Sequence, residues 1–208
     1  MALDDAAAGP TAVQVLRADG AAIARAAVRL RDEAAVIGFP TETCYGLAAA
    51  LDLAGLARLQ RVKGRASEHA LPVIVADRAM LESLVPRLPP LAERLIARHW
   101  PGPLTLVLPA AAGLPAAIVG PGGGVGVRIS SDPVAQQLVR AVGAPITATS
   151  ANRSGAQPAT VALQAALLGV ALVLDDGPRE EPPTTLVELL GTARVLRQGR
   201  CVVDLGGA

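Results

Sequence analysis

Short apolar runs alternate with amphipathic segments rich in Ala, Leu and Arg along the chain, without an internal repeat. β-Branched and apolar runs bounded by turn residues predict strands, whereas apolar positions three or four residues apart predict helices. The predicted strands cover residues 11–16, 35–39, 71–76, 104–108, 125–129, 145–149 and 171–174. Asp19 is expected to cap a helix that runs to about residue 31, and Asp52 one over 53–62. Further helices are predicted over residues 77–85, 90–99, 132–142 and 159–168.

The chain is predicted to close with a cluster of three strands, at residues 184–189, 193–197 and 201–205. Their short connections imply antiparallel pairing, whereas the earlier strands alternate with helices. This combination predicts an α/β (α+β) fold with one twisted mixed β-sheet flanked by helices. We expect a single domain over residues 11–205 after a flexible N-terminus at residues 1–10.

Composition excludes several classes of protein. The 208 residues carry 19 basic and 18 acidic side chains, and 51% are apolar, which excludes a disordered tail and a histone-like basic protein. The two cysteines, Cys44 and Cys201, do not form a disulfide framework and suit a reducing cytoplasm. Prolines and glycines interrupt the long uncharged stretches at 100–127 and 154–174, so no membrane span or secretory signal is expected. A cytoplasmic location is therefore predicted.

The basic residues are distributed unevenly between Arg and Lys, because 18 are Arg and only Lys63 is Lys. An ammonium and a guanidinium differ at a binding site, which makes this exception informative. Lys63 and Arg65 surround Gly64 at the end of a predicted helix, where cations interact favourably with the helix dipole. Stabilisation of the helix end is one explanation for these two cations. The alternative is an anion-binding site, or anion clamp, in which the Lys63 ammonium acts as a point charge and the Arg65 guanidinium makes two parallel hydrogen bonds. The uniqueness of Lys63 favours the clamp.

Polar loops follow two predicted buried strands, at residues 40–46 and 150–155. Ligands collect at strand ends in open α/β sheets, although such loops can also be turns stabilised by local hydroxyls. Cys44 could act as a nucleophile with His69 or His99 as base, but a free cysteine is more often a small buried apolar residue. The histidines lack the spacing of a zinc site. Together the loops and the clamp predict a basic cleft for a polyphosphate, suited to phosphoryl or nucleotidyl transfer.

Five ordered motifs make the chain recognisable. They are the Pro-Thr-Glu-Thr-Cys-Tyr-Gly-Leu segment at 40–47, Lys-Gly-Arg at 63–65, Pro-Gly-Pro-Leu-Thr at 101–105, Val-Gly-Val-Arg at 125–128 and Thr-Ser-Ala-Asn-Arg-Ser-Gly at 149–155. Looser matches occur at 184–188 and 196–199. The chain resembles the YrdC/TsaC family of threonylcarbamoyl-AMP synthases from about residue 12 to residue 204. The resemblance implies a YrdC-like fold in the short, single-domain form.

The resemblance implies a reaction in which L-threonine, bicarbonate and ATP give threonylcarbamoyl-AMP and pyrophosphate. The product would be the donor for N6-threonylcarbamoyladenosine in tRNA, transferred by separate partner proteins. Mg²⁺ would be the cofactor, held through the ATP phosphates and not by a metal site of the protein. A weak contact with tRNA or double-stranded RNA is also conceivable.

The resemblance also assigns roles to residues of this chain. The expected catalytic residues are Lys63, Arg65, Ser150 and Asn152. ATP would be bound by these four together with His69, Arg128 and Arg197. Threonine would be bound by Thr43, the Ala148 backbone, Thr184 and Arg128. The chain departs from the family pattern at Ala66, Ser130, Thr184 and Glu188.

Two alternatives remain open from the sequence. One is an RNA-binding module without synthase activity, although a net charge of +1 offers little to a phosphate backbone. The other is carbamoyl adenylation of a different substrate, either carbamoyl phosphate in place of threonine and bicarbonate or a different amino acid or acyl group. In the second case the changes at Ala66, Ser130 and Thr184 would accompany an altered side-chain pocket.

Overall fold

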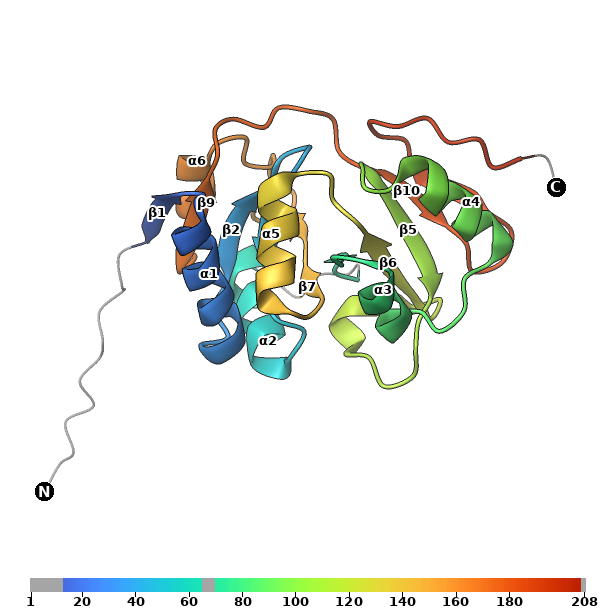
Figure 1. The fold of residues 1–208 in the computed structure, drawn as a ribbon, viewed down its shortest axis with the longest axis horizontal. Helices are drawn as coiled ribbons and strands as arrows, with labels where there is room; N and C mark the ends of the chain where they lie inside the picture. Colours follow the sequence, from blue (N-terminus) through green and yellow to red (C-terminus); the bar gives the residue numbers. More distant parts are fainter. Residues whose placement is uncertain (1–12, 65–69, 207–208) are drawn as a thin grey trace, which may run out of the picture.

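The computed structural model describes residues 13–64 and 70–206 and contains two mixed β-sheets (Figure 1). The five-stranded sheet has the order β1-β9-β2-β3-β8, formed by Gln14–Arg17, Leu172–Asp175, Ile37–Pro40, Tyr45–Ala48 and Thr149–Ser150. The six-stranded sheet has the order β11-β10-β5-β6-β4-β7, formed by Arg194–Arg197, Thr185–Glu188, Leu104–Pro109, Gly124–Arg128, Val73–Ile74 and Ile146–Thr147. The α/β class is confirmed. The prediction of one sheet is wrong.

The reason for two sheets lies in the predicted strand 145–149, which divides at Ala148. The residues before Ala148 form β7, which pairs antiparallel with β4 of the six-stranded sheet. The residues after Ala148 form β8, which pairs antiparallel with β3 of the five-stranded sheet. The Ala148 amide donates to the carbonyl of Pro72, 2.8 Å away, so the break itself is hydrogen-bonded. One short apolar run thus links the two sheets.

Four of the six α-helices in the described residues begin directly after an aspartate that caps them, whereas the two that begin at Pro90 and Ala162 have no side-chain cap. The six helices are α1 (Gly20–Asp32), α2 (Leu53–Lys63), α3 (Arg78–Leu84), α4 (Pro90–His99), α5 (Pro133–Val142) and α6 (Ala162–Ala166). Asp19, Asp52 and Asp77 each accept a hydrogen bond from the backbone amide three residues later. Asp132 caps α5 through the amides of Val134 and Ala135. No helix within residues 13–64 and 70–206 has the length and hydropathy of a membrane span.

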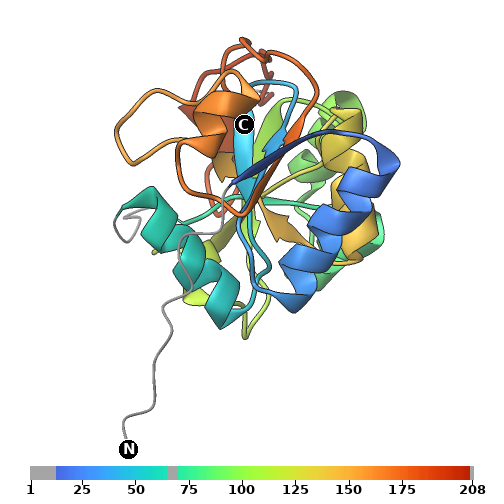
Figure 2. The same ribbon diagram turned by 90° about the vertical axis from the view of Figure 1, so that its left-hand side faces the viewer.

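The helices cover both faces of the five-stranded sheet (Figure 2). On one face, α1 and α5 pack against each other, and their small apolar side chains bury Ile37, Phe39 and Leu174. On the other face, apolar residues of α2 and α6 belong to a second core cluster with β3, and this cluster continues into the six-stranded sheet. The hydrophobic core is therefore continuous from one sheet to the other.

Three other predictions differ from the structure. The predicted loop 40–46 ends early, because Tyr45–Ala48 forms β3 against β2. The predicted helix 159–168 is shorter, since the backbone of Ala159 is used by Tyr45 and Ala151 before α6 can begin. Residues 201–205 form no strand; instead Cys201, Val203 and Leu205 pack against the hydrophobic core, and the Cys201 carbonyl accepts from Thr185 Oγ1. The predicted N-terminus 1–10 lies outside the described residues.

Candidate active site

A cavity of about 820 Å³ is lined by residues from both sheets. Its walls include parts of β3 and β8 from one sheet and parts of β4, β5, β6, β10 and β11 from the other. Eight residues predicted for the site line it: Thr43, Lys63, Arg128, Ala148, Ser150, Asn152, Thr184 and Arg197. The other two predicted site residues, Arg65 and His69, lie outside the described residues, as does Ala66. Segments separated by more than a hundred residues in the sequence thus meet around one space.

Lys63 is the last residue of α2 and is buried at the cavity wall. The helix ends there because Gly64 adopts φ +83°, a left-handed conformation that favours glycine. The Lys63 Nζ donates to the Ser150 carbonyl at 2.9 Å and to Asn152 Oδ1 at 2.7 Å. Burial lowers the pKa of Lys63 to about 8. The ammonium is therefore directed by the 150–152 loop, and its charge is sensitive to pH.

The 150–152 loop is itself hydrogen-bonded around Asn152. Its Oδ1 also accepts from the Ser150 hydroxyl at 2.7 Å, and its Nδ2 donates to the Ala156 carbonyl at 2.6 Å. The amide orientation is thus fixed by donors on one side and an acceptor on the other. The predicted clamp and the predicted Ser/Asn loop form one connected unit.

Arg128, at the end of β6, brings a second buried cation to the cavity. Its Nη1 donates to Glu42, and Ser130 Oγ donates to the other oxygen of the same carboxylate at 2.5 Å. Burial raises the pKa of Glu42, but the charge and hydrogen bond of Arg128 and the hydrogen bond of Ser130 outweigh this and lower it overall. Glu42 is therefore a carboxylate at neutral pH.

Arg197 and Thr184 form a third polar group in the cavity wall. The Arg197 guanidinium donates to the Thr184 carbonyl at 3.0 and 3.1 Å and to its Oγ1 at 3.0 Å. Thr105 Oγ1, from β5, donates to the same Thr184 oxygen at 3.1 Å. Because Thr184 Oγ1 accepts twice, its own proton is left for an acceptor such as a carboxylate. Thr105 was not among the predicted site residues, although a threonine inside an otherwise apolar strand can indicate a site residue.

The 41–44 loop completes the wall next to Arg128. Thr41 Oγ1 donates to the Cys44 carbonyl at 2.7 Å and lies 3.1 Å from Thr43 Oγ1, so the two hydroxyls hold the loop closed. Burial raises the pKa of the Cys44 thiol, which keeps it protonated and unsuited to nucleophilic attack. Tyr45 is fully buried, and its one hydroxyl proton is shared between the Gly177 carbonyl at 2.9 Å and Asp175 Oδ1 at 3.2 Å.

The Sua5/YciO/YrdC family model, described as telomere recombination, matches residues 29–199. The chain belongs to this family. A threonylcarbamoyl-AMP synthase of Thiobacillus denitrificans is 37% identical over 167 residues, which are 78% of this chain and 88% of that protein. One of Bacillus subtilis is 41% identical over 161 residues, which are 75% of this chain and 46% of that protein.

Solved structures agree with the family assignment. Sua5 of Pyrococcus abyssi complexed with L-threonine matches with a TM-score of 0.83 and 35% identity, covering 91% of this chain and 58% of that one. The chain therefore spans about half the length of the longer relatives. YciO of Escherichia coli, at 24% identity and a TM-score of 0.82, shares the fold. The YrdC-like fold is confirmed.

Proposed function

We propose that the cavity converts L-threonine, bicarbonate and ATP into threonylcarbamoyl-AMP and pyrophosphate. The observation that carries the proposal is that Lys63, Arg128 and Arg197, each held by oxygen acceptors, line one cavity of about 820 Å³. Relatives matched over most of the chain are named for this synthase activity. These relatives support the synthase interpretation over an RNA-binding module.

The chemistry requires two anions to approach each other. The threonine amine and bicarbonate condense to a carbamate with loss of water, and a carbamate oxygen then attacks the α-phosphorus of ATP as the bond to the pyrophosphate oxygen breaks. Catalysis then consists mainly of positioning and charge neutralisation, which preorganised cations supply. Lys63 would contact the phosphates beside Ser150 and Asn152, and Arg128 would lie between nucleotide and threonine. The Thr184 hydroxyl would donate to the threonine carboxylate, next to Thr43 and the Ala148 backbone.

Mg²⁺ fits this proposal as an ion carried by the nucleotide. No group of three His, Cys, Asp or Glu side chains suited to a metal occurs in the described part of the chain. The cavity instead presents cations, which suit phosphates. When bound through those phosphates, Mg²⁺ would neutralise charge that develops on the pyrophosphate.

The direct test is pyrophosphate release from ATP and Mg²⁺ in the presence of bicarbonate, with and without L-threonine. Threonine-dependent release is expected. Pyrophosphate release at the same rate with and without threonine would contradict the proposal. So would the absence of pyrophosphate release from a folded protein that binds ATP. Replacing threonine by carbamoyl phosphate in the same assay tests the carbamoyl-adenylation alternative.

The proposed cellular context follows from the reaction. A threonylcarbamoyl adenylate is a donor that other proteins would transfer to tRNA, in the cytoplasm. Filter binding of tRNA at low and moderate salt should show weak, salt-sensitive retention, since the net charge is only +1. Tight binding at moderate salt would favour the RNA-binding alternative.

A further inference from the structure

Glu42 and Ser130 lie behind Arg128 and are not part of the cavity wall. Glu42 belongs to the loop after β2, and Ser130 lies between β6 and α5. The side chains of Glu42 and Arg128 are only 8% and 6% exposed, and Ser130 is fully buried. A buried carboxylate that touches both a cavity-lining cation and a second donor is costly to desolvate unless it is fully paired. The contacts of Glu42 with Arg128 and Ser130 therefore indicate a role for this carboxylate beyond packing.

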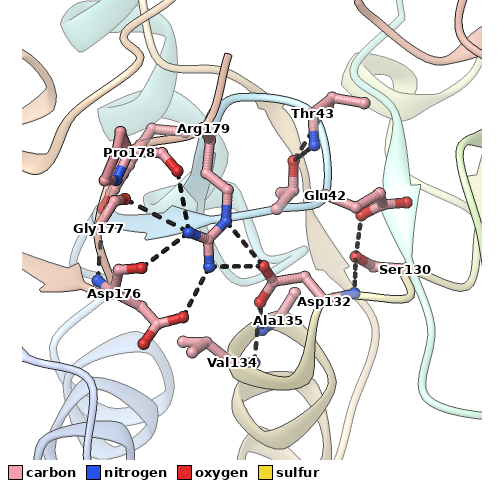
Figure 3. Close-up of polar contacts among 12 residues, drawn as sticks. Glu42, Thr43, Ser130, Asp132, Val134, Ala135, Asp176, Gly177, Pro178 and Arg179 are labelled. Carbon is pink, nitrogen blue, oxygen red and sulfur yellow. Dashed lines mark hydrogen bonds and ion pairs between the residues drawn. The ribbon is translucent and has the colours of Figure 1, made fainter. Parts of the chain in front are cut away.

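Neighbouring donors fix the direction of the hydrogen bonds that Glu42 accepts. The Asp132 amide donates to Ser130 Oγ at 3.3 Å, so the hydroxyl proton is left to point at Glu42 Oε2 (Figure 3). The other carboxylate oxygen, Oε1, accepts from Arg128 Nη1. Glu42 is thus held from two sides, which sets the plane of its carboxylate and, through it, the orientation of the Arg128 guanidinium.

The turn that carries Ser130 is held in place by hydrogen bonds to the rest of the fold. Asp132 is buried, caps α5 and accepts from Arg179 Nε and Nη2 at 3.2 and 3.1 Å (Figure 3). The Ser130 carbonyl accepts from Gln136 Nε2 at 2.9 Å, which ties the same turn to the helix. Ser130 cannot move away from Glu42 without breaking these contacts.

We propose that Glu42 and Ser130 are positioning residues that orient the Arg128 guanidinium toward the two substrates. The inference rests on the proposed function, in which Arg128 touches nucleotide and threonine. Ser130 acts through Glu42, and Glu42 acts through Arg128, while neither touches substrate. Loss of either should weaken transition-state binding more than it weakens the fold.

The surroundings of Glu42 predict a signature in the pH profile. The groups facing it are Arg128 from β6, the Ser130 hydroxyl, the Cys44 thiol and Arg200, whose Nη1 donates to the Glu42 carbonyl at 2.7 Å. The Ser130 hydrogen bond stabilises the carboxylate and lowers its pKa. Removing that hydroxyl raises the pKa, so the acidic limb of the rate profile should move to higher pH.

The test compares Ser130→Ala, Ser130→Thr and Glu42→Gln in the threonine-dependent pyrophosphate assay. Ser130→Ala should lower kcat/KM by about three- to tenfold and Glu42→Gln by about 30- to 100-fold, because hydrogen bonds to charged groups are the stronger ones. Ser130→Thr keeps the hydroxyl and should restore most of the activity. Ser131→Ala, at an exposed neighbour, is the matched control and should leave the profile unchanged.

Equilibrium binding of ATP and L-threonine to the same proteins separates the two proposals. Wild-type kcat/KM and an unshifted acidic limb in Ser130→Ala would overturn the positioning role, even if Glu42→Gln fails to fold. A wild-type protein that binds both ligands without turnover contradicts the proposed function, while weaker binding by Ser130→Ala still supports positioning. If the wild-type protein shows no turnover, equal ligand binding by the wild-type protein and Ser130→Ala would overturn the positioning role.

Discussion

Individual cations in this cavity are oriented by oxygen atoms that the fold supplies. Lys63 is held by a carbonyl and an amide oxygen, Arg128 by a carboxylate and Arg197 by a carbonyl and a hydroxyl. A buried cation is costly to desolvate unless such acceptors are present. Because the acceptors of Lys63 and Arg197 are neutral, these two charges remain available to an anionic ligand.

The Lys63→Ala variant is expected to lose at least about 100-fold in kcat/KM, because removal of a preorganised charge costs this much in comparable sites. The fold should persist, since the substitution leaves α2 and its cap intact. Pyrophosphate release and thermal unfolding together measure this. Arg61→Ala, on the exposed side of the same helix, is the control. Turnover near the wild-type rate would refute the assignment of Lys63.

The low pKa of Lys63 predicts a loss of ATP affinity at alkaline pH. Burial brings this pKa to about 8, so the ammonium loses its proton as the pH rises through that value. The free enzyme then carries less positive charge, and kcat/KM for ATP should fall between about pH 7 and 9. Lys63→Arg keeps its charge over this range and should lose the dependence. A flat wild-type profile would count against a charged Lys63 in ATP binding.

Cys44→Val is expected to be nearly silent in activity. The thiol is kept neutral by burial, and the proposed reaction forms no covalent enzyme intermediate. Kinetics of pyrophosphate release with the variant measure this directly. If a well-folded Cys44→Val protein lost activity, the cysteine would have to take part in the reaction.

At the scale of elements, the connection between β9 and β10 joins the two sheets (Figure 1). Arg179 in this connection donates to Asp132 at the start of α5 and to Asp176 Oδ2 at 2.7 Å. Farther along, the Glu181 amide donates to the Thr43 carbonyl at 3.1 Å. The connection is therefore attached both to a helix cap and to the loop at the cavity wall.

Arg179→Met should lower the free energy of unfolding by about 2 to 4 kcal/mol, because it leaves the buried carboxylate of Asp132 without its cation. Urea denaturation measures the change. The matched control is Arg78→Met, which breaks the exposed pairs with Glu82 and Glu93 and should cost no more than about 1 kcal/mol. Equal effects of the two variants would show that burial of Asp132 does not matter.

At the scale of the whole molecule, one cavity is built from both sheets, so a ligand that fills it touches both. Ligand binding should therefore stabilise the protein as a unit. ATP with L-threonine, each at about 100 times its Kd, should together raise Tm by roughly 10–20 °C. Differential scanning fluorimetry measures the shift, and Lys63→Ala should reduce the ATP component. An unchanged Tm at saturating ligand would contradict binding in this cavity.

Local order was largely determined by the sequence. Aspartates 19, 52 and 77 mark helix starts because a carboxylate satisfies free amides within three residues of itself. The single lysine, the hydroxyl-rich loop after β2 and the Ser/Asn loop pointed to part of the cavity wall, and the family resemblance added Arg128, Ala148, Thr184 and Arg197. Each polar loop alone was also compatible with a simple turn, so the order of several motifs along the chain was needed to identify the site.

The tertiary structure decided what depends on contacts between distant residues. The sequence could not place the break at Ala148, since β4 and β3 compete for adjacent parts of one apolar run. It could not reveal that Thr105 orients Thr184, or that Ser130 holds Glu42 behind Arg128. Periodicity reports which residues are buried, whereas the choice of partner is made by packing across gaps of about eighty residues in the chain.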